Sequence, residues 1–201
     1  MRSPSGWTGH LILDGLILVH LDAGRAHTGW LIGADDLVVP SDLEELSLTA
    51  ASRWKALVPT RLAVLDTAFT ERAAGHRKLV SALVSAAART ASWLLAKSLV
   101  TASPAVEERL LLLFALYGER WGIVRSDGIL LKLPLTHELL ATLCGVRRPS
   151  VTMAIRSLQT SGVLTRTGSD SWLLSHGATP ETSARHSCWP QYARALGLTA
   201  L

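Results

Sequence analysis

The chain has almost no cysteine. Only Cys144 and Cys188 occur among its 201 residues, and two thiols do not make the disulfide framework of a small secreted domain. Cys144 falls on the apolar side of a predicted helix, where a thiol serves as a small core residue. Cys188 follows His186 closely, but one cysteine and one histidine make an incomplete metal site. A redox or metal role for Cys188 stays open as an alternative.

Apolar runs of membrane-spanning length are also missing. The closest, Ala82 to Val100, is interrupted by Arg89 and Lys97, whereas a span needs about 20 predominantly apolar residues. The region after Met1 has no apolar core of the signal-peptide type. Hydrophobic residues make up 48% of the chain and charged residues 18%, as in ordinary globular proteins. We therefore expect a cytoplasmic protein with no membrane partner.

Patterns that carry catalysis or hold metals do not occur. The seven histidines are scattered along the chain, without the paired spacing that holds zinc on a helix. The sequence contains no Gly-x-Ser-x-Gly elbow and no glycine-rich phosphate loop ending in lysine. We therefore expect no enzyme, no catalytic residue and no cofactor that the sequence can name.

The most informative region runs from Leu135 to Leu158. Apolar residues at helical spacing keep one face of two short segments for a shared core. Thr136 is a suitable N-cap for the first segment, and Gly145 permits a sharp reversal between the two. Pro149 fits the first turn of the second segment, where its missing N–H costs nothing. The region predicts a helix-turn-helix whose second helix opens with two arginines, as a DNA major groove would require.

A β-hairpin is predicted directly after the second helix. Gly162 ends that helix, and two strands follow around the turn Gly168-Ser169-Asp170. Arg166 lies near the tip and suits a phosphate oxygen. A further strand, Ile129 to Leu133, leads into the first helix. A hairpin at this distance from a helix-turn-helix is typical of a wing.

Three motifs in this region resemble the CRP/FNR family of bacterial transcription regulators. They comprise residues 135–140, 143–152 and 158–164, and a weaker resemblance extends over most of the chain. Members of the family carry an N-terminal β-roll sensor, a long dimerisation helix and a C-terminal winged domain. The resemblance therefore implies an α+β fold with four parts: a shortened β-roll over residues 1–69, a dimerisation helix over 70–101, a winged helix-turn-helix DNA-binding domain over 102–178, and a C-terminal tail over 179–201.

Short strands with turns are predicted in the N-terminal third. Residues 11–13 and 16–21 flank Asp14-Gly15, which is a hairpin signal. Residues 30–32 and 37–39 flank a second turn, and residues 61–65 form the last strand after Pro59. The family's roll is about twice as long as the room before the long helix, so we expect an abbreviated roll.

The resemblance also implies where a cyclic nucleotide would bind, and there the chain differs. The family uses a Gly-Glu pair, followed by an Arg-Ser or Arg-Thr pair that holds the cyclic phosphate. The corresponding segment here, residues 39–46, lacks Gly-Glu and is acidic, and Ser52-Arg53 stands in reversed order. Arg53 among several acids makes a poor phosphate site. We expect no dependence on cAMP or cGMP.

Between Glu71 and Val100 the chain has no proline and one glycine, Gly75. Apolar residues alternate at spacings of four and three, which predicts a helix with a heptad seam that pairs with a second copy. The alternative is a helix packed on its own β-roll. Lys97 in this seam would splay its far end. Ser103-Pro104 marks a hinge before another helix over residues 106–121. The predicted dimer contacts are Leu79, Leu83, Ala86, Thr90 and Trp93.

Arg147 and Arg148 are the residues we expect to contact DNA. An arginine can offer two donors to guanine; alternatively, both arginines contact phosphates and read no sequence. The resemblance places Arg148 at the base-reading position. It places Pro149 and Met153 where many members have an acid and a second arginine, so the operator should differ from that of the best-known members. The predicted DNA contacts are Thr136, Arg147, Arg148, Ser150, Thr152, Met153, Arg156 and Arg166.

The charge is unevenly distributed. The net charge is +4, yet up to Thr70 five basic residues face eight acidic ones, and a basic remainder suits DNA binding. We predict a homodimeric transcription regulator that binds palindromic double-stranded DNA, with RNA polymerase as a further candidate partner and an unknown effector. One alternative is a sensor that holds a metal, haem or other small ligand, with His20, His27 and His76 in the sensor half. Another is a protein-interaction module with weak DNA binding.

Overall fold

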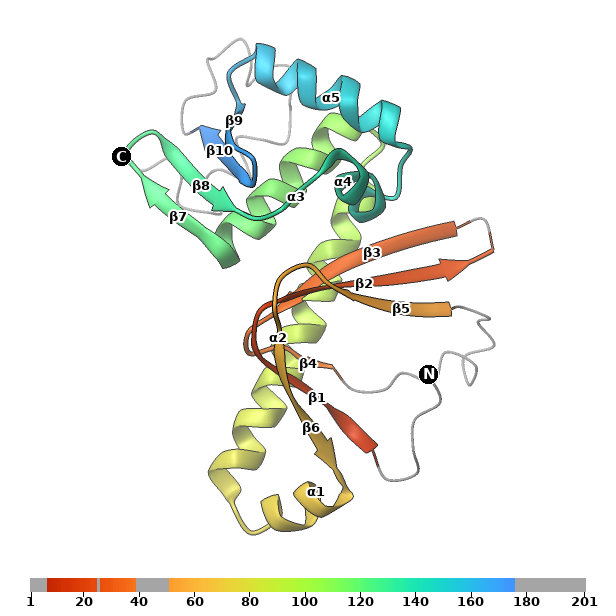
Figure 1. The fold of residues 1–201 in the computed structure, drawn as a ribbon, viewed down its shortest axis with the longest axis vertical. Coiled ribbons are helices and arrows are strands. Elements are labelled where there is room, and N and C mark those ends of the chain that lie inside the picture. The colour runs from red at the N-terminus through yellow and green to blue at the C-terminus, as the bar shows by residue number, and fades with distance from the viewer. Residues whose placement is uncertain (1–6, 25, 39–50, 176–201) are drawn as a thin grey trace. The chain divides into compact units, whose positions relative to one another are not determined.

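The computed structural model describes residues 7–24, 26–38 and 51–175 (Figure 1). The chain divides into two compact units, residues 1–95 and residues 96–201. The division falls inside the long helix α2 (Arg77–Ala102). The predicted C-terminal tail, residues 179–201, and Cys188 within it lie outside the described residues.

The N-terminal unit is built on two three-stranded antiparallel sheets. One sheet has β1 (Trp7–Asp14) in the middle, between β4 (Leu37–Val38) and β6 (Arg61–Asp66). The other has β2 (Leu16–Ala23) in the middle, between β3 (Ala26–Gly33) and β5 (Ala51–Ala56). Apolar side chains from both sheets form one core: Ile12, Ile17, Val19 and Ile32. The predicted β-roll is thus present.

Asp14-Gly15 is a corner between the two sheets, and the predicted hairpin at this point is wrong. β1 and β2 do not pair, because each is the central strand of its own sheet and both of its edges already carry a partner. Gly15 has φ +101°, and a Cβ there would lie 2.3 Å from Oγ1 of Thr60. Only glycine fits this corner. An Asp-Gly pair between apolar runs does not distinguish a turn within a sheet from a corner between sheets.

The turn predicted after β3 is present, and a buried carboxylate closes it. Asp36 is 2% exposed; its Oδ2 accepts the Gly33 N–H at 2.8 Å, and its Oδ1 accepts the Thr90 hydroxyl at 3.3 Å. The hydroxyl oxygen of Thr90 in turn accepts the Leu37 N–H at 3.3 Å. A buried carboxylate is tolerated only when hydrogen-bonded, so Asp36 and Thr90 together fix this turn against α2.

The helical region after the roll is broken near its start. α1 (Thr67–Ala73) is capped by Asp66, whose carboxylate accepts the Phe69 N–H at 2.7 Å. The chain then turns at Ala74 and Gly75 before α2 begins at Arg77. The prediction of one helix from Glu71 is therefore wrong at its N-terminal end, where the single glycine permits the break.

The two faces of α2 have different surroundings. Most of the predicted heptad seam lies on the more buried face, where Ala86 and Thr90 are 4% and 8% exposed, but Leu79 at its start is 38% exposed. Leu83 and Ala86 pack with Leu37 and Leu65 of the roll, as in the alternative that the heptad pattern left open. The opposite face carries an exposed stripe of apolar side chains at spacings of three and four: Val80, Val84, Ala88, Ala91, Leu95 and Leu99.

By length and composition alone, α2 could cross a membrane. The sequence-based expectation that no segment reaches such a length is corrected here, because a helical window tolerates its two cations. Part of its surface nevertheless belongs to folded protein, since Ala86, Thr90 and Val100 are buried. Its apolar composition therefore also serves the packing of both units.

The C-terminal unit is organised around α3 (Val106–Trp121), which has the predicted bounds. Leu110, Leu113 and Phe114 of α3 are fully buried, and the rings of Phe114 and Trp172 lie 5.5 Å apart. An antiparallel sheet in the order β7-β8-β10-β9 packs beside it. Its strands are β7 (Gly122–Arg125), β8 (Gly128–Lys132), β9 (Leu164–Gly168) and β10 (Ser171–Ser175). β7 was not predicted from the sequence, although Ser126-Asp127-Gly128 is a turn signal.

Candidate nucleic-acid interface

Two short helices have the predicted helix-turn-helix arrangement. α4 (His137–Cys144) begins at Thr136, whose hydroxyl oxygen accepts the Leu139 N–H at 3.1 Å. Gly145 ends α4 in the left-handed region, with φ 63° and ψ 39°, a conformation that favours glycine. α5 (Arg148–Thr160) follows at once, with Pro149 in its first turn. The N-cap, the turn and the proline thus act as the sequence predicted.

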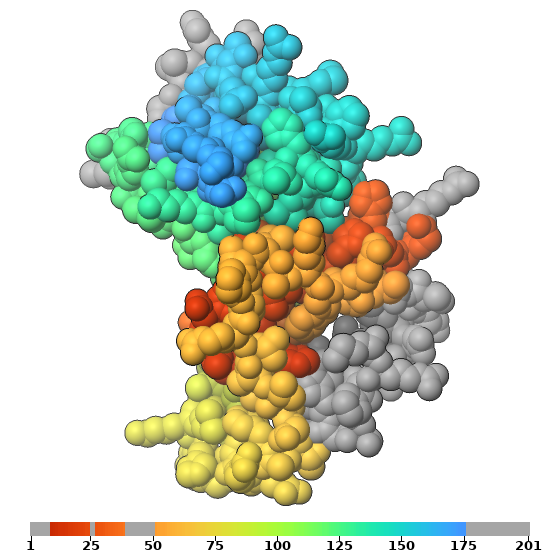
Figure 2. All heavy atoms as spheres, viewed as in Figure 1, coloured from red at the N-terminus to blue at the C-terminus, as the bar shows by residue number. Residues whose placement is uncertain are grey.

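The second helix, α5, separates a core face from a polar outer face. Val151, Ile155 and Leu158 are at most 1% exposed, so this side holds α5 against the unit. Arg148, Thr152 and Arg156 follow at intervals of four residues and are exposed, which places them in one line along the opposite side. Met153 is 75% exposed beside that line. Figure 2 shows α5 and the wing, in cyan and blue, at the outer surface of the C-terminal unit.

The two arginines at the start of α5 differ in position. Arg147 is the N-cap residue and makes no side-chain capping bond, whereas Arg148 is the first residue of the helix. Both are exposed, and within the described residues neither forms an ion pair with an acid. Ser150 is half-buried, and its N–H donates to the Arg147 carbonyl at 3.0 Å. The two guanidinium groups are the available donors at this end of the helix.

A hollow of about 370 Å³ opens where three elements meet, lined by Thr136, His137, Glu138, Arg148 and Arg166. The first turns of α4 and α5 contribute to it, and β9 contributes the third side. Helix N-termini present free N–H groups and partial positive charge, which suit an anion. The hollow unites three of the predicted DNA contacts; His137 and Glu138 were not predicted.

A side-chain bridge links α4 to α5 across this hollow. Nδ1 of His137 lies 3.0 Å from Oγ1 of Thr152, and the Thr152 hydroxyl donates to the Arg148 carbonyl at 3.1 Å. We assign the Nδ1–H tautomer to His137, because the single proton of the Thr152 hydroxyl goes to the Arg148 carbonyl. Thr152 was predicted to reach a base methyl or a phosphate. Its hydroxyl is engaged in this bridge within the protein.

Arg166 holds the turn of the wing as well as lining the hollow. Its Nε donates to the Gly168 carbonyl at 3.1 Å and its Nη2 to the Ser169 carbonyl at 2.7 Å. Its guanidinium carbon lies 5.4 Å from the centre of the Trp172 ring, within the range of a cation–π contact. The guanidinium is therefore fixed before any ligand arrives, so little side-chain entropy remains to be lost on binding.

Charges around the hollow act on His137. Burial first, and then the positive charges of Arg166 and Arg148, lower the pKa of His137 below its ordinary value of 6.5. Glu138 is the carboxylate among the lining residues. The neutral ring therefore predominates near pH 7 in the free protein.

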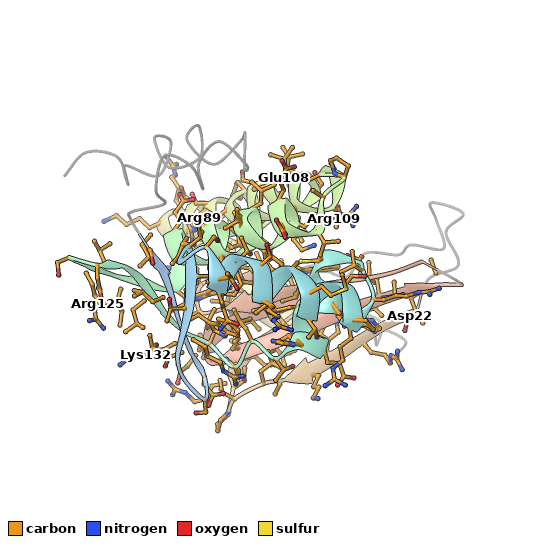
Figure 3. All side chains as sticks on the ribbon, turned by 90° about the horizontal axis from the view of Figure 1, so that it is seen from above. Asp22, Arg89, Glu108, Arg109, Arg125 and Lys132 are labelled. Carbon is orange, nitrogen blue, oxygen red and sulfur yellow. The ribbon has the colours of Figure 1, made fainter. Side chains whose placement is uncertain are left out.

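Arg109 links the start of α3 to the end of α4 through hydrogen bonds. Its Nη1 donates to the Cys144 carbonyl at the end of α4 at 3.0 Å, and its Nε donates to the Ser103 carbonyl at 2.6 Å. A cation at a helix C-terminus is favourable. Arg109 and Glu108, labelled in Figure 3, both lie in the first turn of α3. Cys144 is buried, and burial raises the pKa of its thiol to about 12, which fits the predicted core role.

Two further cations of the unit, Arg125 and Lys132, come from the β7–β8 hairpin (Figure 3). Arg125 pairs with Asp127 at 3.0 Å. β7 forms the edge of the sheet opposite to β9, and strand β8 lies between it and the wing. These cations are not part of the hollow.

The N-terminal unit shows how Arg53 is engaged. On β5, it donates to the Asp22 carboxylate on β2 and lies 3.3 Å from Nδ1 of His20. A carboxylate thus occupies a position that a phosphate would need. The acidic segment 39–46 lies outside the described residues. Among those described, no three His, Cys, Asp or Glu side chains are grouped to hold a metal ion.

The sequence profile of the Crp-like helix-turn-helix domain matches residues 88–176. This range contains α3, α4, α5, the wing and the hollow. No curated protein matches the sequence. The profile match shows that the C-terminal part of the chain is a helix-turn-helix domain of the Crp type.

Solved structures share the fold over most of the chain. A CooA mutant from Carboxydothermus hydrogenoformans is 18% identical, with a TM-score of 0.68 over 86% of this chain and 76% of that one. A CRP-family transcriptional regulator from Thermus thermophilus is 14% identical, with a TM-score of 0.65 over 93% and 91%. A cyclic nucleotide-binding domain protein from Listeria monocytogenes is 13% identical, with a TM-score of 0.69 over 86% and 82%.

The fold combines a β-roll of the cyclic-nucleotide-binding type with a Crp-like helix-turn-helix domain. Residues 88–176 therefore belong to the Crp-like helix-turn-helix domain family, and the chain as a whole shares the fold of the solved regulators. The Crp-like resemblance inferred from the three sequence motifs is thereby confirmed for this C-terminal part.

Proposed function

We propose that the chain regulates transcription as a homodimer that recognises a two-fold symmetric site in double-stranded DNA. The observation that carries the proposal is the outer face of α5, where Arg148, Thr152 and Arg156 form one exposed line that begins at the hollow. A line of this kind fits the major groove, with its N-terminal residues on base edges. No catalytic activity is part of the proposal.

The exposed stripe of α2 supports the dimer. Val84 and Leu95 are 64% and 72% exposed and Leu99 is 56% exposed, which is unusual for large apolar side chains in a row on one helix. Ala88 and Ala91 between them permit a second helix to approach closely. We therefore place the dimer contact on this stripe, and assign Leu83, Ala86 and Thr90 to the packing of the protomer.

Selection of bound sequences from random double-stranded DNA tests the proposal. The dimer should enrich a palindrome whose half-site centres lie about one helical turn (~34 Å) apart. Arg148→Ala should relax the preference at one position in each half-site, by about 1–3 kcal/mol. If the folded wild-type dimer enriches no motif, sequence-specific recognition is wrong for the protein without an effector.

We further propose that DNA binding does not depend on cAMP or cGMP. The pairing of Arg53 with Asp22 supports this, together with the absence of the family's Gly-Glu pair from residues 39–46 of the sequence. Calorimetric titration of the protein with either nucleotide should show no heat of binding, and micromolar affinity would contradict the proposal. A different effector and an RNA polymerase contact stay untested. We place the regulator in the cytoplasm, where its DNA is.

A further inference from the structure

The hollow beside α5 contains a group that can change its charge. His137 lines the hollow together with Thr136, Glu138, Arg148 and Arg166. Its Nδ1 is held by the Thr152 hydroxyl at 3.0 Å, so the ring is fixed between α4 and α5. With Nδ1 carrying a proton toward Thr152, the other ring nitrogen, Nε2, is the one that titrates.

The surroundings of His137 oppose its protonation while the hollow holds no anion. On the neighbouring elements the charged groups around the ring are Arg148 on α5 and Arg166 on β9, and on its own helix Glu138. Burial of the ring and the two guanidinium charges hold its pKa below 6.5. Arg166 does not swing away easily, because two carbonyls of the wing turn hold it.

An anion in the hollow would reverse this balance. A DNA phosphate carries one negative charge, which would offset the repulsion from the two arginines and favour the imidazolium. The two helix N-termini and the fixed guanidinium group of Arg166 suit such a phosphate, while Arg148 at the start of α5 stays available to a base edge. Protonated His137 would then add one more charge-assisted donor. Binding of the phosphate and uptake of the proton would therefore reinforce each other.

We infer that His137 couples DNA binding to proton uptake: a backbone phosphate of the DNA occupies the hollow, and the imidazole is protonated in the complex. The inference rests on the proposed DNA binding and adds to it a positioning residue and a pH dependence. No proton is taken up at Nδ1, which stays bonded to Thr152. The affinity for DNA should consequently fall as the pH rises, for any sequence that fills the hollow with a phosphate.

The direction and size of the effect follow from linkage. The pKa of His137 is below 6.5 in the free protein and higher in the complex, so between these two values the complex binds more protons. In this window the association constant should decrease by up to about tenfold per pH unit for each protomer bound. Above the pKa in the complex the dependence should vanish.

Fluorescence anisotropy with a labelled duplex, at constant ionic strength from pH 5.5 to 8.5, measures this directly. The wild type should lose affinity with rising pH. His137→Gln should show no such decline, and the affinity of His137→Arg should not depend on pH through this position. His76→Gln, which removes a histidine between α1 and α2, should keep the decline of the wild type.

The outcomes separate the two proposals. DNA binding whose pH dependence is the same in the wild type and in His137→Gln would overturn the role of His137 and leave the proposed function standing. Absence of DNA binding at every pH would overturn both. The imidazole ¹⁵N signals of the free and bound protein give a second readout, because only protonation at Nε2 on binding agrees with the inference.

Discussion

At the scale of single residues, the proposed function assigns sequence reading and phosphate contact to different ends of the outer face of α5. Arg148 borders the hollow at the start of the helix, where base edges are reached in a helix-turn-helix. Arg156 lies two turns further along the same face. A side chain at that depth along the helix faces the DNA backbone, so its contribution should be the same for all sequences.

Arg156→Ala should therefore weaken the binding of specific and unspecific DNA alike. The slope of log K against log salt should become shallower by about one unit for each phosphate that the variant no longer neutralises. Arg125→Ala is a matched control, because Arg125 is paired with Asp127 on the far edge of the sheet. Titrations over a series of salt concentrations measure the slopes. A changed base preference in Arg156→Ala would assign that residue to base contact instead.

Lys97 makes a second prediction at this scale. The sequence placed it at the far end of the heptad seam, and in the structure it is 6% exposed; burial lowers its pKa below 10.5, with Arg109 adding to the effect. Burying an ammonium without an acid is unfavourable. Lys97→Met should thus raise the free energy of unfolding at pH 7 by about 1–3 kcal/mol, whereas Lys78→Met, at an exposed position, should leave it unchanged.

The lowered pKa of Lys97 predicts that the stability of the protein rises with pH. The folded pKa of Lys97 lies below the unfolded value of 10.5, so between the two values the folded state binds fewer protons and stability rises with pH. Lys97→Met should lack this rise. Urea unfolding of the wild type and both variants from neutral pH up to the unfolded pKa measures it. A less stable Lys97→Met variant would show that the ammonium has a favourable role.

His137 shows why one site residue could not be predicted. Its neighbour Thr136 was identified because an N-cap is a local signal, read from the residues that follow it. The role of His137 depends on Thr152 and Arg166, which are 15 and 29 positions away. Only the folded helix-turn-helix and wing bring these groups together.

At the scale of elements, the local signals were sufficient for α3 and the helix-turn-helix, although strand β7 was missed. The bounds of α3 and the cap, turn and proline of the helix-turn-helix are as predicted, because helical periodicity and capping depend on neighbours in the chain. The Asp14-Gly15 corner was not predictable in the same way. β1 pairs with β4 and β6, which are distant from it in sequence, and not with β2, which follows it directly.

Gly145 makes the element-scale prediction. Its φ of 63° places it in the left-handed region between α4 and α5. Gly145→Ala should lower the free energy of unfolding by about 1–2 kcal/mol, because a Cβ is disfavoured in this region. Gly145→Asn should cost less, since asparagine tolerates left-handed backbone. Gly75→Ala, where a Cβ would meet nothing within 4 Å, is the control. Thermal unfolding by circular dichroism measures the differences, and a neutral Gly145→Ala would contradict the proposed strain.

At the scale of the whole molecule, α2 has apolar residues on both sides. The sequence pattern showed a heptad seam but could not tell which side the roll would cover. The structure answers this for the protomer: Leu83 and Ala86 pack with Leu37 and Leu65, and the exposed stripe remains on the other side. A seam that stabilises the protomer is a poor place to test association, since its disruption unfolds the unit.

Two substitutions on α2 should therefore have different consequences, one for association and the other for folding. Leu95→Asp, at a position that is 72% exposed, should leave the protomer folded and dissociate the dimer, because a carboxylate would be buried between two copies without a partner. Leu83→Asp should instead lower the melting temperature, since it places the carboxylate against the roll. Sedimentation velocity at micromolar concentration and thermal unfolding by circular dichroism separate association from folding. A wild-type protein that sediments as a monomer would refute the dimer. A Leu95→Asp variant that stays dimeric with wild-type affinity would place the contact somewhere other than the exposed stripe.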